Sequence, residues 1–251
     1  MQTAPLSDLI GHLNALLNPS AFDDYGPNGL QVPGNDAIGT VVTGVSASVE
    51  LFERAAKHDA DLVLVHHGLF WAKSGPPAPI DAQLKRRLQI LFENEMALAA
   101  YHLPLDAHPE VGNNALLARA IGATDAEPFV GIGVRARLPG ITPDDLRARV
   151  CEATGGREPL AFLAGPDAVR TIGIVSGGAA RHLDDAIAAG LDAFVTGEPR
   201  EPVMNDAREA GIHFLAAGHY ATETFGVRAL GDRLAAEFGI RHIFADVPNP
   251  I

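Results

Sequence analysis

Residues 63–71 read VLVHHGLFW, an apolar run that leads directly into two adjacent histidines, His66 and His67. The run is short and rich in branched side chains, as is typical of a strand buried in a parallel sheet. Gly68 follows the histidines and allows the backbone to turn sharply. Ligands of open α/β sheets bind beyond the carboxyl ends of the strands. We therefore predict a functional site at this histidine pair.

Strand-like and helical patterns alternate on both sides of this run. We expect a strand over 41–48, a helix over 49–58 and a strand over 61–65, which together form a right-handed unit with parallel strands. Further helices are expected over 7–17 with Ser7 as N-cap, and over 81–95, 113–121, 143–154, 182–189, 202–209 and 222–238; further strands are expected over 96–101, 131–138, 160–163, 171–175, 193–196, 213–217 and 243–247. This alternation predicts an α/β fold.

Three segments are expected to lie outside helices and strands. Residues 28–32 (NGLQV) are interpreted as a tight turn, and residues 75–79 (GPPAP) as a rigid surface loop. The stretch from Leu103 to Pro109 contains two prolines and is expected to be a loop rather than a helix.

The chain also contains an internal repeat. Residues 42–67 resemble residues 175–198: each segment has a strand, a small-residue turn, an alanine-rich helix, an aspartate and a second strand that ends in potential ligands. In both halves the next strand ends at a histidine, and a carboxylate follows four residues later. We expect one domain over 1–251, made of two pseudo-duplicated α/β lobes, approximately 1–125 and 126–251, which face each other across a metal-binding cleft.

Composition limits the classes of function. The chain has 251 residues, of which 47% are hydrophobic and 20% charged, and these proportions suit a globular protein with a sizeable core. A formal net charge of -12 argues against a nucleic-acid partner, which requires a basic surface. We see no signal peptide, and no apolar run approaches the roughly 20 residues of a membrane span. The single cysteine suits a reducing compartment, so we expect a cytoplasmic protein without a membrane partner.

Histidines and carboxylates at the strand ends favour a metal site for zinc, iron or manganese. Successive strand side chains point to opposite sides, so His66 and His67 are expected to bind different ions of a pair. His219 and Glu223 share one face if their helix begins at or before His219. Asp106 adds a carboxylate, and either Asp106 or Glu223 would serve as the bridge between two ions.

Other residues near these positions leave several roles open. His102 is interpreted as a ligand, as a hydrogen-bond partner of a ligand or as a substrate contact, and His108 has the same alternatives. Phe70 and Trp71 fit packing between lobes, with a base-stacking wall as the alternative. We find no nucleophile elbow, Walker A loop or dinucleotide-binding glycine motif.

Several motifs in this order resemble one known family. They are His66-His67-Gly68-Leu69-Phe70-Trp71, His102-Leu103-Pro104-Leu105-Asp106, Gly112-Asn113-Asn114, Thr196-Gly197-Glu198 and Gly218-His219-Tyr220-Ala221-Thr222-Glu223. Together they resemble the Nif-three-like dinuclear metal centre family, also labelled GTP cyclohydrolase I type 2-like, in its short bacterial form without the inserted domain. Ser46 departs from the pattern, because many members carry aspartate after the first strand.

The resemblance implies two divalent metal ions held by five ligands, with Glu223 as the bridge. These ligands are His66, His67, Asp106, His219 and Glu223. It also implies a ring-shaped homohexamer. We expect a hydrolase in which a metal-activated water attacks a ring carbon or a phosphoryl group of a small nucleotide-like or phosphoester substrate.

In this hydrolase His102 or Glu198 would shuttle protons. The alternative is a metal-binding regulatory or scaffold ring without turnover, because family membership does not establish an activity.

Overall fold

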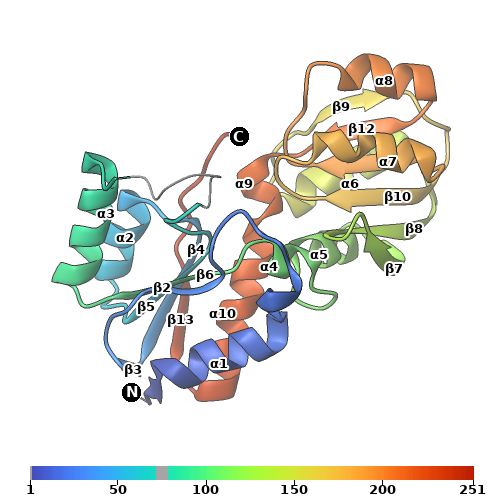
Figure 1. Cartoon of the computed structure of the whole chain (residues 1–251). Coiled ribbons are helices and arrows are strands. Elements are labelled where there is room, and N and C mark those ends of the chain that lie inside the picture. Colours follow the sequence, from blue (N-terminus) through green and yellow to red (C-terminus); the bar gives the residue numbers. More distant parts are fainter. Residues whose placement is uncertain (1, 72–78) are drawn as a thin grey trace. The chain divides into compact units, whose positions relative to one another are not determined.

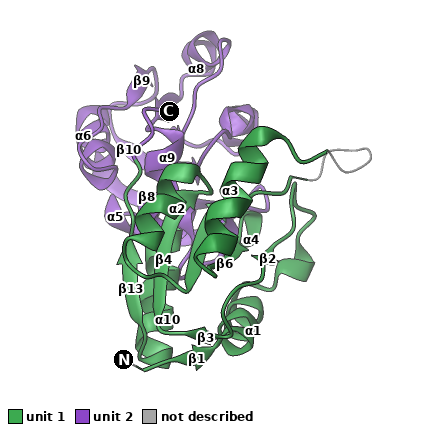
Figure 2. Cartoon of the chain, turned by 90° about the vertical axis from the view of Figure 1, so that its left-hand side faces the viewer, with its two compact units in different colours: residues 1–105, 226–247 green, residues 106–225, 248–251 purple. Residues whose placement is uncertain are grey.

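The computed structural model describes residues 2–71 and 79–251 (Figure 1). The chain forms two compact units (Figure 2): unit 1 comprises Met1–Leu105 and Gly226–Val247, and unit 2 comprises Asp106–Phe225 and Pro248–Ile251. The expected lobes were 1–125 and 126–251; here the first boundary falls after Leu105, and the last long helix and the last strand belong mainly to unit 1. Most of the loop expected over 75–79 lies outside the described residues.

Unit 1 contains a five-stranded sheet in the order β13-β4-β5-β6-β2. The strands are β2 (Gly29–Val32), β4 (Thr40–Ser46), β5 (Leu62–His67), β6 (Ala97–Ala100) and β13 (Arg241–Phe244). Strands β13, β4, β5 and β6 are parallel, and β2 pairs antiparallel with β6 at the edge. A separate two-stranded antiparallel sheet joins β1 (Ala4–Pro5) to β3 (Ala37–Ile38).

Helices cover both faces of this sheet. Figure 1 shows α2 (Val49–Ala56) and α3 (Ala82–Glu93) on one face, and α1 (Leu6–Leu17) and α10 (Thr224–Phe238) on the other. A short 3-10 helix, Pro19–Ala21, follows α1. The buried core includes Val63 and Leu98 of the strands and Phe52 of α2. A strand whose two faces are both covered needs apolar side chains throughout, which explains the run before His66.

Unit 2 contains a six-stranded sheet in the order β7-β8-β10-β11-β12-β9. The strands are β7 (Thr124–Phe129), β8 (Gly133–Ile141), β9 (Leu160–Leu163), β10 (Val169–Val175), β11 (Ala193–Thr196) and β12 (His213–Ala216). One apolar cluster packs the sheet against α5 (Asn113–Ala120) and α6 (Pro143–Ala153). A second cluster packs it against α7 (Leu183–Ala188) and α8 (Val203–Ala210). The alternation of strands and helices confirms the predicted α/β class.

The internal repeat corresponds to a repeated strand order. Strands β4, β5 and β6 are parallel neighbours with β2 antiparallel at the edge, and β10, β11 and β12 are parallel neighbours with β9 antiparallel at the edge. The two repeated aspartates perform the same task. Asp61 Oδ2 accepts from the Gly39 and Thr40 amides at 2.8 and 2.9 Å, and Asp192 Oδ2 accepts from the amides of residues 170 and 171 at the same two distances.

Three local predictions were wrong. Residues 29–32 form β2 rather than a tight turn, because pairing with β6 satisfies their backbone groups. Leu103–Ala107 forms a short helix, α4, because Pro104 occupies its first turn, where a missing N–H costs no helical hydrogen bond. The cap of α1 is Pro5 rather than Ser7. The sequence pattern also missed β7, which carries polar side chains at the edge of its sheet.

Among the described helices, none has both the length and the apolar character to cross a membrane.

Candidate metal centre

Three histidines gather at the carboxyl ends of two neighbouring strands of unit 1. His66 and His67 are the last residues of β5, and His102 follows β6 by two positions. The ring centroid of His66 lies 4.7 Å from that of His67 and 4.9 Å from that of His102. One potential ligand nitrogen from each ring lies within 4.8 Å of the other two. Parallel pairing of β5 with β6 therefore brings His102 to the predicted histidine pair.

Each of these rings is oriented through its Nδ1 atom. His66 Nδ1 donates to the Tyr101 carbonyl oxygen at 3.0 Å. His67 Nδ1 contacts Ser46 Oγ at 2.9 Å, because Ser46 and His67 are paired in the β4–β5 register. His102 Nδ1 donates to Asp24 Oδ1 at 2.7 Å. A donating Nδ1 leaves the lone pair of a neutral imidazole on Nε2, and such oriented rings are typical of metal ligands.

Asp24 is a site residue that the sequence pattern did not reveal. Its side chain is 3% exposed, and its Oδ2 accepts from Asn28 Nδ2 and the Leu103 amide, both at 2.9 Å. Burial alone would raise the pKa of the Asp24 carboxyl, but the hydrogen bonds from His102, Asn28 and Leu103 hold this pKa below its ordinary value. Asp24 therefore remains a carboxylate that fixes the His102 ring.

Unit 2 carries a second group of candidate ligands, in which Asp106 is held rigidly. Asp106 is buried, and its Oδ1 accepts from Asn113 Nδ2 at 2.8 Å and from Ser176 Oγ at 3.1 Å. Asn114 supports the same region, since its Nδ2 donates to the Asp106 carbonyl and its Oδ1 accepts from the Ser176 amide. The paired asparagines at the start of α5 thus position the Asp106 backbone and carboxylate.

His219 and Glu223 are adjacent in unit 2, as expected for a helix that begins at His219. The helix α9 spans His219–Thr222, and His219 Nε2 lies 3.1 Å from Glu223 Oε1. Glu198 contacts the other ring nitrogen, Nδ1, with its Oε1. The ring therefore lies between two carboxylates. Glu198, which we expected to move protons, orients His219 in this structure.

Burial alone would lower the pKa of His219, but hydrogen bonds and charges from Glu223 and Glu198 outweigh it and raise the pKa to about 9. The protonated, positively charged form of His219 is thus favoured between these carboxylates. Donor atoms bound to one zinc ion at about 2.0–2.2 Å lie roughly 3.3–3.6 Å apart in a tetrahedral site. The 3.1 Å separation of His219 Nε2 and Glu223 Oε1 is an ion-pair distance, slightly shorter than this range.

A glycine turn after β10 makes room for this pair. Gly177 has φ +65°, and a Cβ there would collide with Glu223 Oε1 and lie 3.1 Å from His219 Nε2. The Gly177 amide donates to Thr222 Oγ1 at 3.1 Å, and its carbonyl accepts from the amides of Gly197 and Glu198. The turn therefore joins the ends of β10 and β11 to the α9 segment. Only glycine suits position 177, because the φ angle there is positive and the backbone lies close to Glu223.

His108 stabilises a turn, a structural role that differs from the three roles expected for it. Its Nδ1 accepts from the amides of Glu110 and Val111 at 3.1 and 3.2 Å, which stabilises the turn that leads into α5. This residue is not in the histidine group of unit 1. The donors that do gather, imidazole nitrogens in unit 1 and carboxylates with one imidazole in unit 2, fit zinc, iron or manganese.

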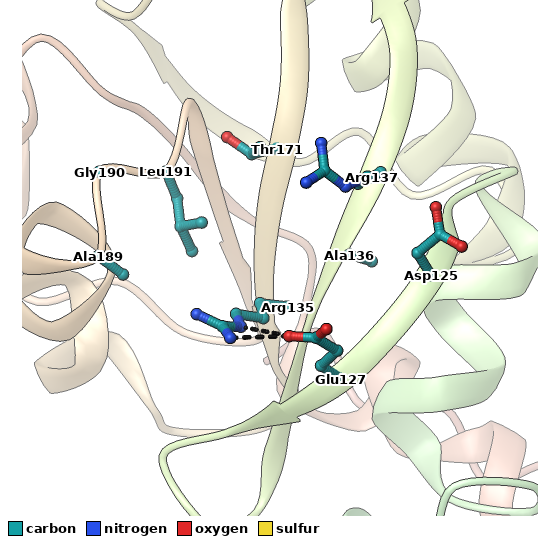
Figure 3. Close-up of a pocket in the computed structure, with 9 residues that line it drawn as sticks. All are labelled: Asp125, Glu127, Arg135, Ala136, Arg137, Thr171, Ala189, Gly190 and Leu191. Carbon is teal, nitrogen blue, oxygen red and sulfur yellow. Dashed lines mark hydrogen bonds and ion pairs between the residues drawn. The ribbon is translucent and has the colours of Figure 1, made fainter.

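Unit 2 also contains a hollow of about 350 Å³ along β7, β8 and β10, apart from the candidate ligands (Figure 3). Its charged side chains include Arg135, which donates to Glu127 Oε2 at 3.0 and 2.7 Å. The charges of this exposed pair neutralise each other, and none of the candidate metal ligands lines the hollow. The hollow is therefore distinct from the metal-ligand groups.

The fold and these donor groups define a two-lobed α/β protein with residues typical of divalent metal sites. A family model described as Duf34/NIF3 (NGG1p interacting factor 3) matches residues 4–250. The chain therefore belongs to the DUF34/NIF3 family, which confirms the resemblance found in the sequence.

Relatives and solved structures of this family cover nearly the whole chain. A protein of Pseudomonas aeruginosa named GTP cyclohydrolase 1 type 2 homolog is 46% identical, with 98% of each chain covered. The solved structure of the protein ybgI, described as of unknown function, has a TM-score of 0.93 and 39% identity, and covers 99% of this chain and 100% of its own. The structure of TTHA1606 from Thermus thermophilus has a TM-score of 0.91 and 40% identity, with coverages of 99% and 100%.

Proposed function

We propose that this protein is a hydrolase that depends on two divalent metal ions and acts on a small nucleotide-like or phosphoester substrate. The proposed ligands are His66 and His67 of unit 1 with Asp106, His219 and Glu223 of unit 2. Glu223 is the proposed bridge between the ions. The name of the Pseudomonas relative supports a substrate of the nucleotide class, and zinc, iron and manganese all suit the donors.

The observation that carries the proposal is the cluster of three oriented imidazole rings, in which His66 and His67 are the proposed ligands and His102 is the proposed base. Their potential ligand nitrogens lie within 4.8 Å of one another, and each ring is held by a protein oxygen at Nδ1. Such outer partners set the tautomer and the basicity of metal-binding imidazoles. A purely structural cluster would not require three rings oriented in the same way.

Chain connectivity supports the assignment of ligands from both units. Asp106 is the first residue of unit 2, directly after Leu105, and Glu223 comes shortly before Gly226, where the chain returns to unit 1. Both carboxylates therefore lie beside covalent links to the unit that contains the histidine pair.

Bound divalent ions would supply Lewis-acid activation of a water molecule and of the substrate oxygen. His102 accepts the proton of the attacking water at Nε2, while Asp24 holds the opposite nitrogen and stabilises the imidazolium that forms. Glu198 acts through His219 by fixing its ring. The rigid hydrogen bonds to Asp106 keep that carboxylate in place during the reaction.

Metal analysis combined with a substrate screen tests the proposal. Protein purified without chelator should contain about two divalent ions per chain, and it should hydrolyse at least one member of a panel of purine nucleotides and phosphoesters. Treatment with a chelator should abolish product formation, and the restored metal should recover it.

A reproducible content of one ion or none at saturating metal would contradict the dinuclear site. Full metal content without turnover on the whole panel would favour the alternative, a metal-binding regulatory or scaffold ring. Product formation that survives complete metal removal would contradict metal dependence.

We also propose that the chain assembles as a ring-shaped homohexamer, on the basis of the family resemblance. Light scattering in moderate salt should give a mass near six times the 26.4 kDa of one chain. A monomer or dimer at micromolar concentration would contradict this assembly.

A further inference from the structure

Unit 1 presents exposed aromatic side chains around His102. Trp71, the single tryptophan of the chain, is 42% exposed, and Tyr25 is 55% exposed. The Trp71 ring centroid lies 5.2 Å from that of His102 in an edge-on arrangement and 5.9 Å from that of His67. The Tyr25 ring contacts His102 from another segment, at a centroid distance of 6.0 Å. In a chain with only 6% aromatic residues, this grouping beside the histidines calls for a specific explanation.

The backbone that carries these rings is held in place by specific contacts. Gly26, next to Tyr25, lies so close to the Phe70 carbonyl oxygen that a Cβ would collide with it. Gln31 joins the same two segments, since its Nε2 donates to the Pro27 carbonyl at 2.9 Å and its Oε1 accepts from the Leu69 amide at 2.8 Å. Aromatic side chains on a fixed backbone bind a flat ligand at a small entropic cost.

We propose that Trp71 and Tyr25 form a stacking subsite for a planar heteroaromatic ring, such as the base of a purine nucleotide. A tryptophan that remains half-exposed offers its apolar face to a ligand, and a base gains stacking energy on such a face. The ring would be positioned next to His102 and His67, the residues that the proposed hydrolase uses. The inference rests on that function for its substrate class, but its test measures binding rather than turnover.

The fluorescence of the single tryptophan reports directly on this subsite. The full-length protein as purified is titrated with guanosine 5′-monophosphate and, separately, with ribose 5-phosphate, which lacks the base. We expect saturable quenching by the nucleotide and none by the sugar phosphate. The titration is repeated after chelation, and quenching by the base should persist because stacking does not require the metal.

Variants separate ring stacking from other effects. By calorimetry, Trp71→Ala should weaken nucleotide binding by roughly 5- to 150-fold, the range of single base-stacking contacts, and Trp71→Phe should recover most of the loss. Tyr25→Ala should also weaken binding, whereas Tyr25→Phe should not, because the ring rather than the hydroxyl makes the contact. Phe92→Ala is the matched control, since Phe92 is a 60% exposed aromatic residue on α3 of the same unit.

Several results would overturn the subsite. These are equal affinity for the nucleotide and the sugar phosphate, unchanged binding in Trp71→Ala, or a tryptophan that acrylamide cannot reach because a second copy of the chain covers it. Hydrolysis of a purine nucleotide at a rate and with a KM unaffected by Trp71→Ala would leave the proposed function intact while contradicting this inference. Binding of the nucleotide base without turnover of any substrate would support this subsite while contradicting the proposed hydrolase function.

Discussion

Replacement of Glu223 by glutamine is expected to weaken both metal ions together, by at least about 100-fold in dissociation constant, since loss of a mere outer partner already costs about 10- to 100-fold. A bridging carboxylate gives one oxygen to each ion and neutralises two cations that would otherwise repel each other. Glutamine keeps the shape but removes the charge. In this structure the substitution also removes a charge partner of His219.

His66→Ala and His67→Ala provide the comparison, because each should weaken mainly one ion. Metal content by titration is the measurement, with circular dichroism as the check on folding. Glu209→Gln, an exposed carboxylate on α8, should leave both ions bound. If Glu223→Gln binds both ions as tightly as the original protein does, Glu223 is not the bridge, and Asp106 is the next candidate.

Replacement of His102 by asparagine is expected to lower kcat by about 10²- to 10⁴-fold, the usual contribution of a general base, while both ions stay bound. The reason is the geometry at Asp24, which holds Nδ1 and leaves Nε2 to accept a proton. The assay uses the substrate identified by the screen, together with metal analysis of the same samples. Loss of an ion in His102→Asn would instead make His102 a ligand.

Asp24→Asn tests the partner of His102. Asparagine retains an oxygen for the hydrogen bond but loses the negative charge that stabilises a protonated ring, so kcat should fall while KM changes little. Asp23→Asn, at the neighbouring position, should change neither parameter. A rise in KM with unchanged kcat in Asp24→Asn would show instead that Asp24 only shapes the binding surface.

Local patterns in the sequence were sufficient to predict the α/β class and the position of the histidine pair at the end of a buried strand. The period of apolar residues reflects burial of each segment, and the strand before His66 carries that signal within a few residues. The four-residue spacing of His219 and Glu223 is equally local. For this reason, the helix that begins at His219 brings the two side chains together as expected.

The partners that orient these residues depend on contacts between distant parts of the chain. Asp24 is 78 positions from His102, and Ser176 is 70 positions from Asp106, so no local period marks either pair. Strand β2 forms because its backbone groups pair with the edge of β6. The residues of β2 by themselves do not reveal this pairing. Side-chain periodicity records whether a residue is buried, whereas the identity of its hydrogen-bond partner is set by strand order and by loops that fold across the strand ends.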